Sequence, residues 1–416
     1  IDVVVKGEAE YALHDLFLNL EKYGRKEAFK KTPNLTFRDS DGRIISTNMR
    51  DVVSTLDQFE FTRLDLVEPI TRTLTSPFTG SKLWNLPVCR GCTENCVTCG
   101  GSKLSYLRLL NRDTPAFRSP QRLLEDFMKL DELGVKSIFL FQDPRIGGET
   151  YVNELLKTFK GMKWSNIRNV GIELFWPASR SYLESLKKSN IAENVGLSIS
   201  PESAVDYIRF AHGRCYSTSD LMKTIIYSKE LNIPIGVFFM LCLAHETHET
   251  IRDAWLLWEK ILSLNFIQCK TSSKISVDFG PMILLDPGSK AFFYPEAHGY
   301  KILFNNFLEL YKNLNNFHWK FWINYETFNM NKSEIGRVIL DSWEALSTIR
   351  WKLGFLTDRE YELEMLRIKF EKTIFKKIDE VVFRRPEESE EIAKELVEIS
   401  RDPFLTWSYI ITEEDL

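Results

Sequence analysis

Four of the chain's seven cysteines lie close together, at Cys89, Cys92, Cys96 and Cys99. Thiolates gathered in one short loop are typical ligands of zinc and of iron–sulfur clusters. A disulfide framework would spread its cysteines along a small secreted fold, and an odd number of cysteines argues against one. The spacing therefore predicts an inorganic site in a reducing compartment.

Three kinds of inorganic site come into question. Zinc usually takes two Cys-x-x-Cys pairs that a longer segment separates, yet only three residues lie between Cys92 and Cys96. A ferredoxin-type cluster uses four cysteines, but in another order of spacings. In the third site, Cys92, Cys96 and Cys99 hold a cubane of four irons, which leaves one iron free to bind a small molecule. Cys89 is then either a small buried hydrophobe or a nearby functional thiol.

Short apolar runs alternate with amphipathic stretches on both sides of this loop. The expected strands are 84–88, 137–141, 170–175, 195–199, 233–243 and 275–284, and the expected helices are 120–133, 151–159, 181–188, 219–231 and 249–264. This alternation predicts a parallel sheet with right-handed crossovers. Six units favour an α/β fold with a partial (β/α)6 barrel over a complete eightfold barrel. Ligands of such barrels bind at the carboxyl ends of the strands, and the cysteine loop follows the first strand.

The Cys-x-x-x-Cys-x-x-Cys spacing after the first strand of a partial barrel resembles the radical S-adenosylmethionine (radical SAM) superfamily. The resemblance implies that Cys92, Cys96 and Cys99 hold a 4Fe-4S cluster, and that S-adenosylmethionine (SAM) chelates the fourth iron. It also implies an external one-electron donor of the ferredoxin or flavodoxin type. Thr98 stands where the family usually has an aromatic residue near the adenine, so the adenine contact is expected to differ.

Two groups after the second strand are candidates for binding SAM. The family often carries Gly-Gly-Glu-Pro at this strand end, where it holds the methionyl ammonium. Here Gly147, Gly148 and Glu149 come several residues late. Either these three reach back to the ammonium, or Gln142 and Asp143 bind it and the glycines merely turn the chain.

Further polar residues lie at the ends of the third and fourth strands. Glu173 and Ser198 emerge from apolar runs, and a polar residue at the top of a barrel strand favours a ligand contact. The segment with Ser200, Glu202 and Ser203 resembles the family's Gly-x-Glu-Ser stretch, whose residues contact the ribose or carboxylate of SAM.

The run from His245 to Glu249 contains two histidines at i, i+3 rather than the i, i+4 of a zinc protease. We expect Thr247 and Glu249 to begin the next helix instead. Several apolar residues are candidates for lining the barrel, although core packing is the commoner role: Trp176, Phe238, Phe239, Met240 and Met282. The remaining cysteines, Cys215, Cys242 and Cys269, are scattered, and Cys242 is expected in the core.

Four segments are expected along the chain. Residues 1–30 resemble the end of the cobalamin-binding domain that precedes the barrel in one radical SAM class, so we expect further sequence upstream. Residues 31–82 contain a hairpin with an Asp-Gly turn and serve as a linker, 83–300 form the barrel, and 301–416 form a helical appendage. The cysteine loop looks most like an archaeal-type group of this cobalamin class. The resemblance implies cobalamin in the full-length protein and methylation or a related radical reaction on an unknown substrate.

The appendage begins its last helix with a capping box at Thr357 and Glu360, and its apolar positions are 363, 366, 370, 374, 378 and 381. The chain carries 54 basic and 58 acidic side chains and a net charge of -4. This balance gives no general attraction to nucleic acid or to anionic membranes. The chain has no apolar run that could cross a bilayer and no leader pattern, so we expect a cytoplasmic protein.

Three other functions stay open at this point. An iron–sulfur electron-transfer or scaffold protein would use Cys89 as a fourth ligand. A zinc-stabilised module would bind RNA or protein. A radical SAM methylthiotransferase acting on tRNA is less consistent with the sequence, which has no distinct basic RNA-binding domain at the C-terminus.

Overall fold

The computed structural model describes residues 2–50, 52–66, 83–266, 274–280, 284–315 and 318–382. Two residues of the sequence analysis, Cys269 and Met282, lie outside these ranges. None of the described helices is long and apolar enough to span a membrane.

Six parallel strands form the central sheet, which confirms the α/β partial barrel. In spatial order they are β11 (Ile275–Phe279), β10 (Ile235–Phe239), β9 (Asn194–Glu202), β8 (Asn169–Leu174), β7 (Ser137–Phe141) and β4 (Leu83–Pro87). Each strand neighbours the next one along the chain, as right-handed βαβ crossovers require. The carboxyl ends of all six strands therefore lie at one edge of the sheet.

Two expected strands are too long. The apolar run 233–243 ends as a strand at Phe239, because the chain turns and Cys242 adopts a φ of 62°. Cys242 is nevertheless fully buried, as expected of a core residue. The last strand ends at Phe279 rather than at residue 284.

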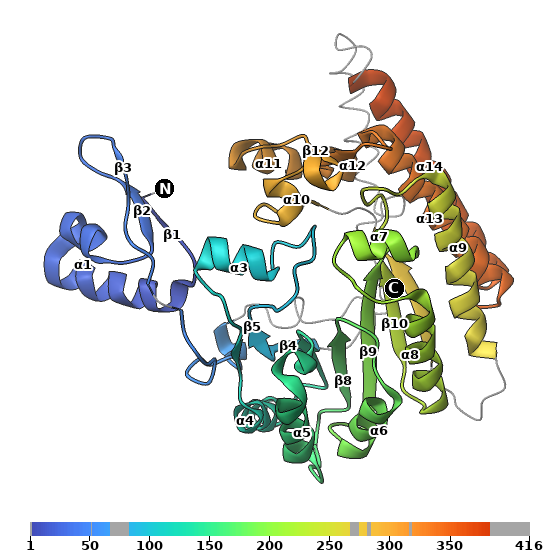
Figure 1. Ribbon diagram of the computed structural model, residues 1–416, viewed down its shortest axis with the longest axis horizontal. Helices are drawn as coiled ribbons and strands as arrows, with labels where there is room; N and C mark the ends of the chain where they lie inside the picture. Colours follow the sequence, from blue (N-terminus) through green and yellow to red (C-terminus); the bar gives the residue numbers. More distant parts are fainter. Residues whose placement is uncertain are drawn as a thin grey trace.

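Helices cover the outer face of the sheet, as Figure 1 shows for the green and yellow helices. They are α4 (Pro120–Glu132), α5 (Gly148–Phe159), α6 (Arg180–Ser189), α8 (Thr218–Glu230) and α9 (His248–Ser263). A serine caps the amino end of each of α4, α6 and α8. The hydroxyls of Ser119, Ser179 and Ser217 each accept a hydrogen bond from a backbone N–H in the first turn of the helix. Thr247 caps α9 in the same way, so the run from His245 to Glu249 begins a helix, as expected.

The edge strand β11 is protected by side chains. The Asn265 amide donates to the Ile275 carbonyl at 2.9 Å and accepts from the Ile275 N–H at 2.9 Å. Arg350 donates to the Val277 carbonyl at 2.8 Å. These contacts satisfy backbone groups that an open edge would offer to another strand.

The N-terminal residues form a small unit with its own core. Its strands β1 (Val3–Val5), β2 (Leu35–Arg38) and β3 (Ile44–Ser46) form an antiparallel sheet, and helix α1 (Ala9–Lys31) packs beside it. The Asp-Gly hairpin is β2–β3, with Gly42 at a φ of 79°. The hairpin thus lies in the same sheet as β1, and the unit projects from the barrel at the left of Figure 1.

Ion pairs join this unit to the barrel. Glu8 accepts from Arg112 at 2.6 Å, and Arg112 is only 2% exposed. Glu10 accepts from Arg90, which lies inside the cysteine loop, at 2.5 Å. The N-terminal unit is therefore fixed directly to the segment that carries the clustered thiols.

The C-terminal residues are not exclusively helical, so that expectation is wrong. Strands β12 (Tyr300–Ile302) and β13 (Tyr325–Thr327) pair antiparallel between short helices α10 (Lys290–Phe293), α11 (Phe307–Leu314) and α12 (Trp319–Trp322). The long helices α13 (Lys332–Lys352) and α14 (Asp358–Val382) follow. The capping box at Thr357 and Glu360 is confirmed by reciprocal hydrogen bonds. Leu366 is 51% exposed, contrary to its place in the expected apolar stripe, because it lines an open groove between α13 and α14.

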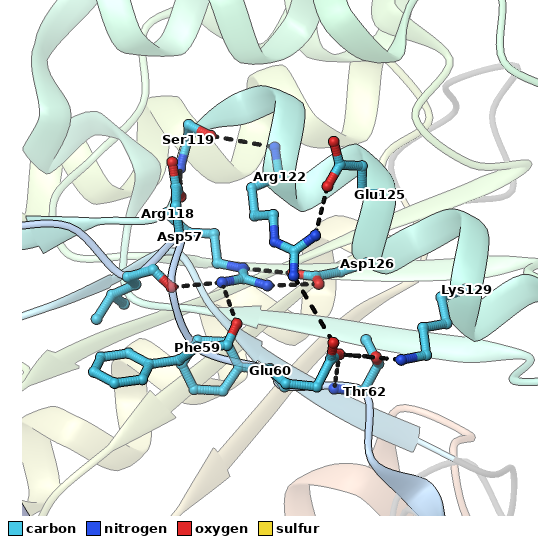
Figure 2. A network of polar contacts seen from close by, with 12 residues as sticks. Asp57, Phe59, Glu60, Thr62, Arg118, Ser119, Arg122, Glu125, Asp126 and Lys129 are labelled. Carbon is cyan, nitrogen blue, oxygen red and sulfur yellow. Dashed lines mark hydrogen bonds and ion pairs between the residues drawn. The ribbon is translucent and has the colours of Figure 1, made fainter. Parts of the chain in front are cut away.

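A buried arginine holds the segment 55–62 against the first βα unit of the barrel (Figure 2). Arg118 is fully buried, and its guanidinium donates to both carboxylate oxygens of Asp126, at 2.6 and 2.7 Å. The same guanidinium donates to the carbonyls of Leu56 and Phe59. The backbone of Arg118 donates to Val88, directly before the cysteine loop. This interaction therefore fixes the start of the loop as well as the segment beside it.

We predict that Arg118→Gln lowers the free energy of unfolding by about 3–5 kcal/mol, because it leaves the Asp126 carboxylate buried without its partner. Urea unfolding measures this change. The matched control is Arg122→Gln on α4, the helix that carries Asp126, because the pair of Arg122 with Glu125 is more exposed and should contribute at most about 1 kcal/mol. Equal losses in the two variants would contradict the assignment.

Candidate functional site

The cysteine loop begins where β4 ends, at the carboxyl edge of the sheet. Cys89 lies in the short strand β5 (Cys89–Arg90), which pairs with β6 (Ala116–Phe117). Cys92 and Cys96 are buried, with 8% and 5% exposure, and Cys99 is half-buried. The three thiols thus face the protein interior at the edge where parallel barrels bind ligands.

Backbone N–H groups point at two of the three sulfurs. The Glu94 N–H donates to the Cys92 sulfur at 3.3 Å, and the Gly101 N–H donates to the Cys99 sulfur at 3.3 Å. Such donors stabilise negative charge on a thiolate and tune the potential of a cluster that it binds. The loop is therefore folded so that its sulfurs are ready to carry charge.

Burial raises the pKa of each of these thiols, and for Cys96 to about 12. The neighbouring thiols Cys92 and Cys99 raise the pKa of Cys96 further, whereas Arg214 opposes the shift. Thiols in such surroundings ionise when a metal binds them rather than as free nucleophiles. The donor set consequently fits an iron–sulfur cluster.

Among the described residues, no three His, Cys, Asp or Glu side chains gather closely enough to hold one metal ion. A cubane binds each cysteine to a different iron, so its ligands do not need to converge on one point. The arrangement of the three thiols is compatible with that requirement.

The loop is held by segments far away in the sequence. The Val97 N–H donates to the His212 carbonyl at 3.0 Å, and the Val97 carbonyl accepts from Ala291 at 2.8 Å. The Gly100 N–H donates to the Asp286 carboxylate at 2.8 Å. Gly213 approaches so closely that a Cβ there would lie 3.2 Å from the Cys96 Cα. These contacts fix the loop between α7 (Asp206–Ala211) and α10.

The ends of β7 and β8 meet beside the loop. The Gln142 N–H donates to the Glu173 carboxylate at 2.8 Å, with Gln142 at a φ of 71°. Burial raises the pKa of Glu173, and the hydrogen bond from Gln142 opposes this shift. The side-chain oxygen of Gln142 is buried and has no hydrogen-bond partner among the described residues. Gln142 and Glu173 therefore lie together with one buried acceptor unused.

Asp143 has a different environment from Gln142. It is fully buried, accepts from the Arg145 guanidinium at 2.6 and 2.9 Å, and accepts from the Phe175 N–H at 2.7 Å. Its oxygens are thus engaged in joining β7 to β8. Gly147 ends a short 3-10 helix (Pro144–Gly147), and Gly148 and Glu149 are exposed in the first turn of α5. These three residues thus form the turn into α5, whereas half-buried Gln142 and Glu173 lie at the ends of β7 and β8.

At the end of β9, Glu202 forms a buried ion pair with Arg214 at 2.9 Å. One oxygen of Glu202 is buried and unpartnered among the described residues. Burial raises the pKa of Glu202 against the opposing effect of Arg214. Arg214 also donates to the Phe175 carbonyl at 3.1 Å, and its positive charge opposes the rise in the pKa of the Cys96 thiol. This arginine links the ends of β8 and β9 to the cysteine loop.

Ser200 and Ser203 differ in their surroundings. Ser200 is half-buried on the inner face of β9. Ser203 is buried and donates to Glu246 at 2.8 Å, so it holds the β9 end to the loop after β10. Phe239 faces helix α9 and packs on Trp258, so the idea that it lines the barrel is wrong.

The sequence analysis missed Arg214, Glu246 and Asp286 as parts of this site. Arg214 lies in a loop after α7 with no motif around it, and its role follows only from its contact with Glu202. Arg214 comes twelve residues after Glu202, and no single helix or strand carries both, so the sequence pattern does not predict that the two side chains meet. Asp286 reaches the cysteine loop from after β11 and could be recognised only by its contact with Gly100.

Comparison with known proteins identifies the fold around this site. Residues 86–255 match the family model described as the radical SAM superfamily. A search of curated proteins found no match. The matched residues run from the end of the first strand into α9 and include the three thiols, Gln142, Glu173 and Glu202.

Solved structures with a similar fold include two kinds of cobalamin-binding enzyme. The cobalamin-dependent SAM radical enzyme OxsB, with aqua-cobalamin and SAM bound, is 13% identical with a TM-score of 0.57, over 95% of this chain and 59% of that chain. The radical SAM methyltransferase TsrM from Kitasatospora setae, with cobalamin and a 4Fe-4S cluster bound, is 14% identical with a TM-score of 0.51. That match covers 73% of this chain and 56% of the TsrM chain. Both likenesses concern the fold, and the chain spans less than two thirds of the length of either enzyme.

We predict that Gly213→Ala reduces the iron content of the reconstituted protein, because its Cβ would press on the backbone of Asn95 and Cys96. Gly134→Ala is the matched control, since Gly134 also has a positive φ, of 79°, but nothing lies within 4 Å of its Cβ. The left-handed conformation should cost both variants about 1–2 kcal/mol of stability. Iron analysis and urea unfolding separate the two effects. Equal iron content in the two variants would show that close approach at Gly213 does not matter.

A second prediction concerns Glu246, whose pKa is raised to about 7 by burial from its ordinary 4.5. The folded protein therefore keeps a proton that the unfolded chain releases, so Glu246 favours folding most below pH 4.5, and this contribution is lost as the pH rises to about 7. Glu246→Gln should gain up to about 3 kcal/mol of stability relative to the wild type between pH 4.5 and pH 8. Urea unfolding across this range provides the test, with exposed Glu184→Gln as the control. Parallel pH profiles for wild type and Glu246→Gln would refute it.

Proposed function

We propose that the protein cleaves SAM reductively in order to modify a substrate by radical chemistry, because residues 86–255 match the radical SAM family model. The observation that carries the proposal is the set of three buried thiols at the carboxyl edge of the sheet, spaced Cys-x-x-x-Cys-x-x-Cys. Two of these sulfurs already accept backbone hydrogen bonds. Cys92, Cys96 and Cys99 would hold the 4Fe-4S cluster.

When bound, the cluster supplies one electron to the SAM sulfonium, which releases methionine and a 5′-deoxyadenosyl radical able to take hydrogen from a substrate carbon. The chain's own task is to bind SAM, orient it and exclude water. Arg214 is placed to attract the carboxylate of SAM from beside Cys96. The unpartnered oxygens of Gln142 and Glu202 are acceptors for its ammonium or ribose hydroxyl groups.

The roles of the other candidate residues follow from their surroundings. Glu173 positions Gln142 through the hydrogen bond to its N–H. Asp143 and Ser203 support the strand ends, because their oxygens are engaged with Arg145 and Glu246. Ser200, on the inner face, is available to a ligand. Gly147, Gly148 and Glu149 turn the chain into α5, which favours the second of the two interpretations of this segment.

We further propose that the full-length protein binds cobalamin and transfers a methyl group or carries out a related radical modification. The support is the fold shared with OxsB and TsrM, both of which have cobalamin bound, and the N-terminal unit that Glu8 and Glu10 fix to the cysteine loop and its surroundings. A low-potential donor of the ferredoxin or flavodoxin type would supply the electron. The place of action would be the cytoplasm.

An electron-transfer protein with Cys89 as a fourth cluster ligand is the rival function. Cys89 is buried and only 1% exposed, and its sulfur lies 3.7 Å from the Gly91 carbonyl, to which the thiol donates. Burial raises its pKa to about 12. Cys89 donates to a carbonyl, whereas the Cys92 and Cys99 sulfurs accept from N–H groups as a thiolate ligand would, and this difference favours the three-cysteine site.

We predict that serine substitution of Cys92, Cys96 or Cys99 abolishes both cluster assembly and the formation of 5′-deoxyadenosine from SAM. The assay is anaerobic reconstitution with iron and sulfide, reduction with dithionite in the presence of SAM, and chromatography of the products. Cys215→Ser, at an exposed position, and Cys89→Ser are the controls and should keep both properties. Loss of the cluster in Cys89→Ser would favour the four-cysteine rival, and product formation by a Cys96→Ser variant would overturn the proposal.

A further inference from the structure

The two faces of the barrel sheet differ in character. Phe239 of β10 and Phe279 of β11 pack on Trp258 of α9, with ring centroids 5.9 and 5.1 Å apart, so they face the outer helices. The alternate residues face inward and are half-buried, among them Phe238 and Asp278. The inner face is therefore the concave one, and it is accessible to a small molecule.

Small residues lie side by side across this inner face. The strand register aligns Glu173, Ser198, Gly236 and Ser276 in one row across four neighbouring strands. One row nearer the amino ends, Gly171 pairs with Gly196. A Cβ added at Gly196 would meet nothing within 4 Å. The Phe139 ring fills the space over Gly171, whereas Gly196, Gly236 and Ser276 leave the sheet hollow on this side, towards β11.

A cavity of about 450 Å³ lies at the amino-terminal half of β9, β10 and β11, where Leu262 of α9 and Phe355 and Leu356 after α13 also line it. Its lining includes Gly196, Gly236, Ser276, Asp278, Lys274 and Arg350. This volume lies within the range of small-molecule sites. We refer to it as the inner hollow.

The charge of the inner hollow is positive. Lys274 and Arg350 are its cationic lining residues, and Asp278 is its anionic one. Arg350 reaches in from α13 and donates to Asp278 and to the Val277 carbonyl. Its side chain remains 29% exposed. A guanidinium held in one orientation by two acceptors is suited to bind a carboxylate or a phosphate.

The inner hollow and the candidate site lie on the same sheet at different heights. Gly236 is three residues before Phe239, which pairs with Glu202 at the end of β9. Three residues of a strand rise about 10 Å. Half-buried Ser198, Ser200 and Phe238 cover the distance between them.

We propose that the inner hollow binds the anionic end, a carboxylate or a phosphate, of the substrate on which the proposed radical chemistry acts. Arg350 and Lys274 neutralise this end, and the reacting carbon lies near the cysteine loop. The substrate must therefore extend about 10 Å beyond its anionic group. The inference rests on the proposed function for the identity of the ligand as a substrate, but the binding of an anion can be measured independently.

Saturation-transfer NMR on the reconstituted full chain tests the proposal with three probes of one chain length: octanoate, octyl phosphate and octanol. We expect at least one anion to bind tenfold or more tightly than octanol, and the tighter anion identifies a carboxylate or a phosphate as the natural end group. Arg350→Gln should weaken anion binding about tenfold or more. Arg252→Gln, a surface change on α9 outside the inner hollow, should leave it unchanged.

A second variant guards against misfolding of Arg350→Gln. Gly196→Leu fills the inner hollow without removing a charge or a hydrogen bond, so it should abolish binding of the anion. Its urea-unfolding midpoint should equal that of the wild type. Equal affinity for octanol and both anions, or undiminished anion binding in Gly196→Leu, overturns the proposal. Formation of 5′-deoxyadenosine by the wild type is measured separately, so a failure of the proposed function is distinguished from a failure of this inference.

Discussion

The backbone hydrogen bonds that hold the cysteine loop are the constraint on which the site depends. Three thiols can serve one cluster only if the chain between them has a fixed shape, and this loop lacks regular secondary structure to provide it. The contacts of Val97 with His212 and Ala291 supply that shape from two distant segments. Below the loop, the Arg118 backbone N–H donates to the Val88 carbonyl, and its guanidinium donates to the carbonyls of Leu56 and Phe59 while it pairs with buried Asp126. The parallel sheet therefore gives the loop its location, and these long-range contacts give it its geometry.

The polar groups around the loop form a connected arrangement rather than separate ligands. Arg214 pairs with Glu202, donates to the Phe175 carbonyl after β8 and opposes the rise in the pKa of Cys96. One guanidinium therefore connects the ends of two strands with the cysteine loop. Buried carboxylates such as Glu202 and Glu246 are costly unless they are paired or protonated, and both have raised pKa values. Among the described residues, the unpartnered oxygens of Gln142 and Glu202 are acceptors suited to a polar ligand. On the inner face, the small residues Gly196, Gly236 and Ser276 leave room for a second ligand.

The sequence predicted the features that depend on local pattern. The apolar runs located all six strands, and 137–141 was matched at both ends because polar residues bound that run. The Asp-Gly turn and the capping box at Thr357 were recognised for the same reason, since each depends on a few adjacent residues. Features that depend on distant contacts were not predictable. The run up to Leu243 looks like a continuous strand, but Cys242 turns the chain, and β12 and β13 pair across more than twenty residues. Asp143 looks free in the sequence, and only the fold shows that Arg145 occupies its carboxylate.

Electron paramagnetic resonance of the reduced, reconstituted protein, recorded with and without SAM, tests the central claim most directly. The claim is that three cysteines hold a cluster with one iron open to SAM. The account predicts a signal from a reduced 4Fe-4S cluster whose g values shift when SAM is added, because SAM binds that iron. A cluster signal that SAM leaves unchanged would mean that all four irons have protein ligands, and the protein would then have to be regarded as an electron carrier.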